Sequence, residues 1–278
     1  MFKMSDAVDL HVHTSFSDGL LTPAKTVELA ESLLLAAVAI TDHDTVEGIE
    51  GALQAAAKLS VEVVPGVELS TEYDNREVHI LGYYIDHTHP GLSVLLEKLR
   101  RSRHGRAQKI VDKLRHLGLV VDYQEVMRLA GEAAPGRAHI ARALVNNGHV
   151  ESVRDAFEQL IGYRRPAYVE RLKLSPGDAI SAIRAAGGVA VWAHPGLTGK
   201  DSLLERFLPW GLKGLEVYHP DHSCLQSARY RKMAHRINLC ITGGSDFHGS
   251  DASRARGLGS CGVTVKELLE LKKLEGAK

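Results

Sequence analysis

The chain has 278 residues, of which 44% are hydrophobic and 24% are charged, and its 34 basic and 34 acidic side chains balance. This composition supports a sizeable core and excludes a disordered or collagen-like chain. The longest apolar run, residues 33–40, is far shorter than the roughly 20 residues of a membrane span, and the N-terminus lacks the apolar core of a signal peptide. Its three cysteines form no C-x-x-C pair, so we expect neither a disulfide framework nor a zinc knuckle, and we expect a soluble cytoplasmic protein.

Short apolar segments rich in β-branched residues recur along the chain and predict the strands of one buried, parallel sheet. Amphipathic helices lie between them: Ser175-Pro176 begins one that ends at Gly187, and Thr264 with Glu267 forms a capping box at the start of the last. This alternation predicts an α/β fold. The predicted strands are residues 7–10, 36–41, 61–67, 78–84, 188–193, 214–218 and 239–242.

Residues 90–166 interrupt the alternation, because they contain several helical patterns and no strand pattern. Leucines and β-branched residues follow helical spacing from residue 92 to residue 117, and Gly118 is the stop signal. Asp122 and Glu125 form a second capping box, with further helices around residues 140–145 and 153–160. We therefore expect a barrel whose first part is residues 1–89 and whose second part is residues 167–278, with a helical insertion at 90–166.

Charge is unevenly distributed along the chain. The first 97 residues hold 4 basic and 16 acidic side chains, whereas residues 98–171 hold 15 basic and 8 acidic ones. The acidic excess indicates either bound cations or a solvated surface. Eight basic residues with one opposing acid lie between positions 98 and 115, which indicates either a polyanion-binding surface or a solvated helix face. They are Lys98, Arg100, Arg101, Arg103, Arg106, Lys109, Lys113 and Arg115.

Polar side chains follow the predicted strands at their C-terminal ends. Because the ends of the strands of a barrel meet at one rim, these side chains favour a closed or nearly closed barrel with its site on that face. The residues are His11, His43, Glu68, His194, His219 and Asp246.

Nine residues form a candidate metal-binding set. In an extended strand end, His11 and His13 point to the same side and can reach one cation, and Asp246 and His248 repeat that spacing. Joint metal binding explains nine such residues better than nine separate roles, and with one bridging carboxylate they suffice for three cations. The mixture of imidazole and carboxylate suits manganese, iron or zinc, and argues against magnesium alone. The set is His11, His13, Asp18, His43, Glu68, His79, His194, Asp246 and His248.

Together, residues 9–13, 40–45, 65–68, 193–195 and 244–248 resemble the signature of the PHP (polymerase and histidinol phosphatase) family of metallophosphoesterases. The resemblance implies a distorted (β/α)7 barrel with up to three divalent metal ions, manganese before iron or zinc. It also implies one plausible ligand assignment, with Glu68 as the bridge. The first metal would take His11, His13, Glu68 and Asp246, the second Glu68, His79 and His194, and the third Asp18, His43 and His248.

Residues 136–142 and 163–169 are similar to the branch of that family that includes 3′,5′-nucleotide bisphosphate phosphatase and a 5′-to-3′ exoribonuclease. This implies hydrolysis of 3′,5′-bisphosphorylated nucleotides, of 5′ ends of short RNA, or of both, by in-line attack of a metal-bound hydroxide. Arg164-Arg165-Pro166 departs from the Gly-Lys-Pro frequent in that branch, and residues 32–35 lack a glycine frequent in the family. A phosphatase acting on another small phosphomonoester, such as histidinol phosphate, is the alternative. No membrane and no obligate protein partner are expected.

Four residues outside the metal set are candidate substrate contacts. Arg137 can form a bidentate pair with a second phosphate and His139 can donate to it, although Arg137 has the alternative role of a surface helix cap. His219 and His222 either contact phosphate or protonate the leaving group, or they are ordinary loop histidines.

Overall fold

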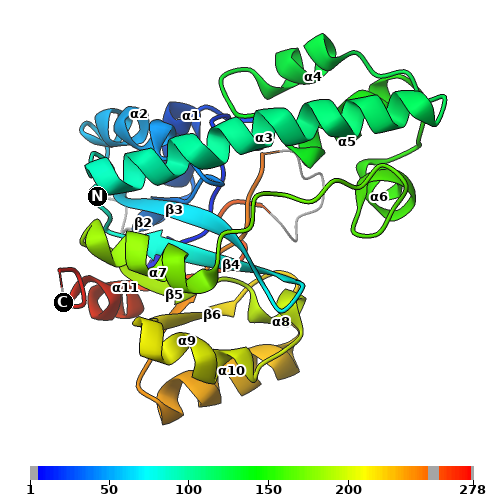
Figure 1. Ribbon diagram of the computed structural model, residues 1–278. Coiled ribbons are helices and arrows are strands. Elements are labelled where there is room, and N and C mark those ends of the chain that lie inside the picture. Colours follow the sequence, from blue (N-terminus) through cyan, green and yellow to red (C-terminus); the bar gives the residue numbers. More distant parts are fainter. Residues whose placement is uncertain (1–5, 250–256, 277–278) are drawn as a thin grey trace.

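The computed structural model describes residues 6–249 and 257–276, and in them eight strands form one sheet in the order β7-β6-β5-β4-β3-β2-β1-β8. The sheet curls until it nearly closes, because the N–H of Leu10, just after β1, donates to the carbonyl of Gly243 in β7 at 3.1 Å. Helices surround the strands (Figure 1), which confirms the predicted α/β barrel. The strands are β1 (Ala7–Asp9), β2 (Ala37–Ile40), β3 (Glu62–Tyr73), β4 (Arg76–Tyr83), β5 (Val189–Trp192), β6 (Gly214–Tyr218), β7 (Cys240–Gly243) and β8 (Val263–Thr264).

The strands separate two apolar cores. Ala37 and Ala39 of β2 belong to a cluster made mainly of strand residues and α11 (Val265–Lys272), whereas Val38 and Ile40 belong to a cluster with the surrounding helices. Successive side chains of a strand point to opposite faces, so this short apolar run supplies both the inside and the outside of the barrel.

The sheet is mixed, and the expectation of a wholly parallel sheet is wrong. β4 runs antiparallel to both β3 and β5, and the two-residue β8, which the sequence patterns did not reveal, runs antiparallel to β1. β3 and β4 are joined by Asp74 and Asn75, whose positive φ angles of 53° and 56° suit a tight hairpin turn. Apolar content alone does not give strand direction, and this short polar turn was the available signal. Pairing with β4 also extends β3 to Tyr73, beyond its predicted end.

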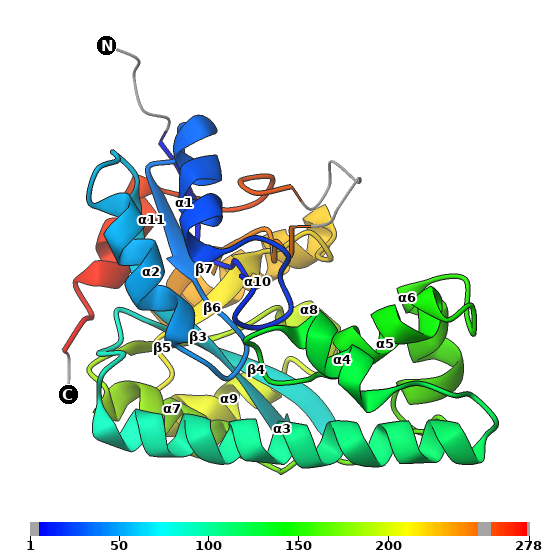
Figure 2. The same ribbon diagram turned by 90° about the horizontal axis from the view of Figure 1, so that it is seen from above.

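The longest helix, α3 (Pro90–His116), belongs to two cores. Leu92, Leu96 and Leu99 in its first half pack with the barrel, whereas Ile110 and Leu114 in its second half pack in a separate cluster formed by residues 107–167. We call residues 107–167 the helical part. Figure 2 shows α4, α5 and α6 beside the second half of α3, away from the strands. The structure thus places a second core inside the predicted insertion, whose limits at 90 and 166 we keep as a proposal.

Two helices begin at their predicted signals, whereas the capping box predicted for Asp122 and Glu125 is not formed: Asp122 accepts the Gln124 N–H at 2.9 Å, and Glu125 accepts the side-chain amide of Asn147. α7 begins after Ser175, whose side chain accepts the N–H of Asp178 at 3.1 Å, and α11 begins after the Thr264 capping box. Every helix within residues 6–249 and 257–276 is too short or too polar to cross a membrane. The other helices are α1 (Pro23–Ser32), α2 (Glu47–Ala56), α4 (Tyr123–Ala130), α5 (Arg137–Asn146), α6 (Val153–Ala156) with a π-helical continuation (Phe157–Ile161), α7 (Pro176–Ala185), α8 (Pro195–Thr198), α9 (Leu203–Phe207) with a 3₁₀ turn (Leu208–Trp210), and α10 (Cys224–Arg236).

Candidate metal centre and adjoining pocket

The nine predicted ligands converge at one rim of the barrel, around the buried carboxylate of Glu68 in β3. Its Oε2 lies 3.4 Å from the Nε2 atoms of both His11 and His13 and 2.8 Å from Nδ1 of His43. Its Oε1 lies 2.8 Å from Nδ1 of His79 and 3.0 Å from Nε2 of His194. One carboxylate therefore lies among five imidazoles that come from four different places in the barrel.

The three remaining ligands lie on either side of His13. Asp246 Oδ1 is 3.1 Å from His13 Nε2, and Asp18 Oδ1 is 3.2 Å from His248 Nε2 and 4.0 Å from His13 Nδ1. The rings of His13 and His248 stack with centroids 4.3 Å apart. The two i, i+2 pairs thus face one another, as the strand-end geometry predicts.

The ligand atoms fall into overlapping groups, each spanning no more than 4.8 Å. One group contains His11, His13 and Glu68 of the first predicted ligand set. Another contains the whole third predicted set, to which it adds His13. The unexpected member is His219, which groups with His11 and Asp246, its Nε2 being 3.5 Å from Asp246 Oδ2. The groups are His11–His13–Glu68, His43–Glu68–His79, His13–Asp18–His43–His248 and His11–Asp246–His219.

The hydrogen bonding of these side chains indicates that they suit divalent cations. Several of its nitrogen and oxygen atoms are buried and make no hydrogen bond of acceptable geometry with the described residues. Each such atom costs about 1–3 kcal/mol when unpaired, and Glu68 has about four lone-pair positions for its five imidazole neighbours. Cations would satisfy the electron-pair donors among these atoms together, while one ring nitrogen of His13 keeps its proton. The atoms are His11 Nε2, both ring nitrogens of His13, Asp18 Oδ1, His43 Nδ1, Glu68 Oε2, His194 Nδ1 and His219 Nε2.

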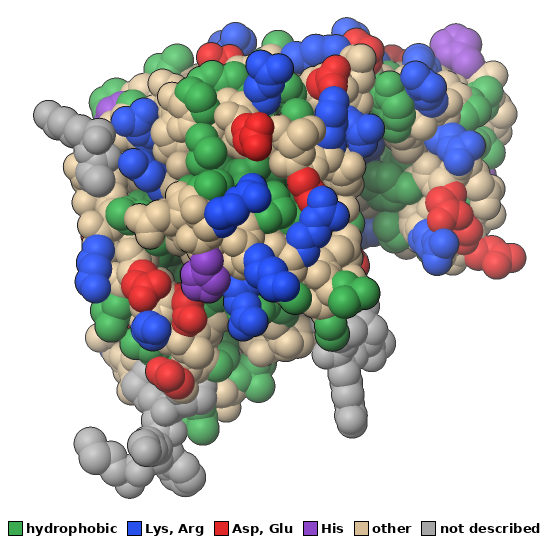
Figure 3. Space-filling model, turned by 90° about the horizontal axis from the view of Figure 1, so that it is seen from below, with side chains coloured by type: hydrophobic (Ala, Val, Ile, Leu, Met, Phe, Trp, Pro, Cys, Tyr) green, Lys and Arg blue, Asp and Glu red, His purple; other side chains and the backbone are tan. Residues whose placement is uncertain are grey.

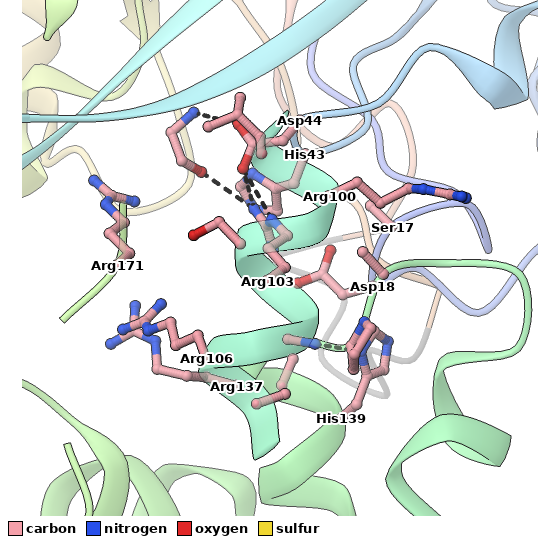
Figure 4. A pocket seen from close by; sticks show the side chains of 18 of the residues that line it. Ser17, Asp18, His43, Asp44, Arg100, Arg103, Arg106, Arg137, His139 and Arg171 are labelled. Carbon is pink, nitrogen blue, oxygen red and sulfur yellow. Dashed lines mark hydrogen bonds and ion pairs between the residues drawn. The ribbon is translucent and has the colours of Figure 1, made fainter. Parts of the chain in front are cut away.

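A pocket extends from this centre to the helical part, between Asp18 and His43 on one side and α3 and α5 on the other. Arginine side chains from three segments project into it (Figure 4). Arg103 is paired with Asp44, whose Oδ2 accepts its Nε–H at 2.9 Å. The polar lining includes Arg100, Arg103, Arg106, Arg137, His139 and Arg171.

One corner of the pocket carries an excess of positive charge. The carboxylate of Glu77 forms ion pairs with Arg171 Nη1 at 3.0 Å and with Arg137 Nη2 at 3.4 Å. Arg106 lies beside them and makes no ion pair with a described residue. Burial and the neighbouring Arg137 lower the pKa of Arg106 to about 10, so its guanidinium remains charged at neutral pH. Three guanidiniums facing one carboxylate form a site for an anion such as phosphate. We call Arg106, Arg137 and Arg171 with Glu77 the arginine corner.

The PHP domain family matches residues 9–170. This chain belongs to the PHP family. A 5′-3′ exoribonuclease of Haemophilus influenzae is 37% identical over 251 residues, 88% of this chain and 91% of the relative. A 3′,5′-nucleoside bisphosphate phosphatase of Chromobacterium violaceum is 35% identical over 247 residues, 87% of each chain. The solved structure of a protein from Bifidobacterium adolescentis, assigned as a metal-dependent phosphoesterase, superimposes with a TM-score of 0.88 and 32% identity, covering 95% of this chain and 94% of the other. The PHP-type barrel is thus confirmed, and the protein is a hydrolase of phosphate esters.

A buried carboxylate that the sequence analysis missed contacts two of the candidate metal ligands. Glu216 in β6 lies 2.9 Å from His11 Nδ1 through Oε1, and its Oε2 accepts the backbone N–H of His194 at 2.7 Å. Burial raises the pKa of Glu216, but His11 together with His219 and His194 lowers it overall, so the carboxylate is ionised. This contact fixes the proton of His11 on Nδ1 and turns Nε2 to the centre. The available signal was a glutamate inside an apolar strand.

Two buried aspartates hold the PHP ligand loops. Asp9 accepts the N–H and hydroxyl of Ser245 at 2.9 and 2.6 Å, which ties β1 to the loop that carries Asp246. Burial raises the pKa of Asp9 to about 6, although its hydrogen bonds oppose the rise. Asp42 accepts the N–H and hydroxyl of Thr14, each at 2.7 Å, and so fixes the loop between His13 and Asp18.

The four predicted substrate contacts lie in different surroundings. Arg137 and His139 line the pocket, and His139 Nδ1 accepts the Gly136 N–H at 3.1 Å, which leaves the ring proton on Nε2. Burial lowers the pKa of His139 to about 4, so the ring is neutral at pH 7. His219 faces the metal centre. His222 has both nitrogens engaged, Nδ1 with the Val217 carbonyl at 3.0 Å and Nε2 with the Gly196 N–H at 3.1 Å, which indicates a structural role.

Proposed function

We propose that this PHP hydrolase acts on nucleotides that carry a second phosphate, namely 3′,5′-bisphosphorylated nucleotides or the 5′ ends of short RNA. The observation that carries the proposal is the arginine corner, a site with an excess of positive charge in a pocket that Asp18, His43 and His79 of the nine candidate metal ligands also line. A phosphomonoester without a second anion would leave that charge excess unused. The two relatives named above act on substrates of the proposed kinds.

Glu68 and the eight other candidate ligands would hold up to three divalent ions, for which the imidazole and carboxylate donors suit manganese, iron or zinc. Bound there, such ions supply activation of water and neutralisation of phosphoryl oxygens. Glu68 faces imidazoles through both oxygens, so it would be the bridging ligand.

The chain's own residues position the nucleotide. Arg137 and Arg171 present guanidinium groups that can bind a phosphate in bidentate fashion, and Glu77 holds both while the pocket awaits the substrate. His139, at the start of α5, carries its proton on Nε2 and hydrogen-bonds the backbone of Ser17, so it fixes the loop next to Asp18 at the edge of the pocket. With one phosphate held in the corner and the other at the rim, the reacting group is fixed in orientation, and such positioning lowers the entropic barrier of the reaction.

The test is a comparison of substrates and of variants. Wild-type protein supplied with manganese is expected to hydrolyse 3′-phosphoadenosine 5′-phosphate far faster than 3′-adenosine monophosphate or histidinol phosphate. Arg137→Ala should lose about 30-fold to 150-fold in kcat/KM on the bisphosphate, because a charge-assisted contact is worth about 2–3 kcal/mol. The loss on the monophosphate should be small. The exposed Arg128 of α4 supplies the matched control, Arg128→Ala. Faster turnover of histidinol phosphate, or equal losses on both nucleotides, would refute the proposal.

A further inference from the structure

The arginine corner is not the end of the pocket. A second hollow shares the corner's four residues with the pocket and adds Tyr163 and Tyr168 to its walls. A third hollow shares these two tyrosines and adds Lys109, Lys113 and Arg164. A continuous path therefore leads from the corner to the surface of the helical part. Figure 3, which views the molecule over α9 and α10, shows the surface hollowed toward its right, between the barrel and the helical part.

Two aromatic rings and two guanidiniums line this path. The rings of Tyr163 and Tyr168 meet edge to face with centroids 5.5 Å apart, and Tyr163 is 54% exposed. The guanidinium of Arg164 lies 5.2 Å from the Tyr163 ring centre, and that of Arg106 lies 5.8 Å from the Tyr168 ring centre. An exposed ring beside a cation is how proteins bind single-stranded nucleic acids, with bases on the rings and phosphates on the cations.

Lys109 and Lys113, both on α3, add positive charge to the path. They are four residues apart, so they share one helix face, and neither ammonium forms an ion pair within the part of the chain that the structure describes. Lys113 Nζ donates to the Tyr168 carbonyl at 2.7 Å, which holds the tyrosine segment against the helix. Glu170 is the one acidic side chain lining the third hollow, so the local charge there is positive.

The structure divides seven of the eight basic residues of the run into two classes, and the eighth, Lys98, is exposed outside the hollows. Arg100 and Arg101 pair with Glu97, Arg103 with Asp44, and Arg115 with Asp112. Arg106, Lys109 and Lys113 face the hollows instead. Of the two alternatives for this run, the polyanion-binding surface therefore applies to the residues of one face only, Arg106, Lys109 and Lys113.

We propose that Arg106, Lys109, Lys113, Tyr163, Arg164 and Tyr168 form a groove for the part of a single-stranded RNA that lies outside the catalytic pocket. The inference rests on the proposed function and deepens it. A strand whose terminal nucleotide occupies the pocket has its next phosphate at the arginine corner, and the following base reaches Tyr168 and Tyr163. A mononucleotide bisphosphate ends at the corner and leaves the groove empty.

The test measures binding separately from hydrolysis. A fluorescent 5′-phosphorylated RNA pentamer with phosphorothioate linkages is titrated with the metal-loaded protein by anisotropy over a salt series, and turnover of 3′-phosphoadenosine 5′-phosphate is measured in parallel. Tyr163→Ala should weaken pentamer binding by about 5-fold to 150-fold, the range for loss of one base–aromatic stack. Lys109→Gln with Arg164→Gln should reduce the salt slope by about 1.4, at about 0.7 per phosphate contact. Turnover of the bisphosphate should change less than about twofold.

Arg101→Gln with Arg115→Gln is the matched control, because both side chains lie on α3 outside the groove. Equal pentamer affinity and salt slope in wild type, groove variants and control would overturn the groove, as would failure of wild type to bind the pentamer. If pentamer binding depends on the groove while the bisphosphate is not hydrolysed, the groove stands and the proposed function falls. The thermal midpoint of each variant checks its folding, and Tyr163, Lys109 and Arg164 are exposed, so little change is expected.

Discussion

Glu216 offers a test of how the barrel orients its metal ligands, because the carboxylate itself makes no contact with the pocket. The change is Glu216→Gln, which preserves shape. The amide oxygen can replace one carboxylate oxygen, but the amide nitrogen then faces either His11 Nδ1–H or the His194 N–H, both of which are donors. One charge-assisted hydrogen bond is therefore lost, worth about 1.5–3 kcal/mol.

That free energy corresponds to about 10-fold to 150-fold in an equilibrium constant. It should be expressed as weaker metal binding, because His11 is free to rotate or to change tautomer. Titration of metal-free protein with manganese in competition with a chelating dye measures the effect directly, without any substrate. The control is Glu205→Gln on the exposed side of α9. Metal affinity within twofold of wild type, with normal turnover, would refute the orienting role.

Three further expectations follow from the site. Asp246→Asn and His13→Ala should each lose at least one metal ion by elemental analysis and nearly all phosphatase activity while the circular dichroism spectrum is kept; full occupancy would contradict their role as ligands. Glu68→Gln should be at least as damaging, because a neutral amide bridges two cations poorly. The folded-state pKa of His139, about 4, is below its ordinary value of 6.5. The neutral ring therefore contributes about 3 kcal/mol to the free energy of unfolding above pH 6.5, and this contribution is lost as the pH falls to 4. When the free energy of unfolding is measured with urea across this pH range, His139→Gln should not show that loss. A wild-type pH dependence in the variant would contradict the buried neutral ring, which Asp18, Arg103 and Arg142 face.

The convergence of the candidate metal ligands was predictable because local geometry determines where they point. Residues two apart in an extended strand share a side, and the C-terminal ends of strands meet at a rim, so His11 and His13 could be placed together from spacing alone. The same reasoning placed His219 at the rim but did not place it in a ligand group. It lies on a loop, and only the loop conformation decides that it faces His11 and Asp246 while His222, three residues on, faces Val217 and Gly196.

The arginine corner was only partly visible in the sequence because its members are distant in the chain. Glu77 and Arg171 are 94 residues apart, and each is unremarkable in its own segment. Their pairing depends on how the chain around Arg171 runs past the N-terminal end of β4, where Glu77 lies. No short-range sequence pattern encodes this. Arg106 was noticed within the basic run, but a run gives charge without direction, and the packing of α3 decides which of its side chains face the pocket.

Because the two halves of α3 pack in two different hydrophobic cores, the helix limits where the helical part can be exchanged between related enzymes. A boundary placed at residue 90, where the strand pattern stops, would remove Leu92, Leu96 and Leu99 and strip the barrel of part of its own covering. A chimaera that keeps both cores needs its junction inside the helix, between Leu99 and Ala107. The exposed Gly105 lies in this interval, and a Cβ added there would meet nothing within 4 Å, so the position tolerates a change of residue. Arg103 and Arg106, which line the pocket, flank that position, so a borrowed helical part would change the lining of the pocket while the candidate metal ligands on the barrel are kept.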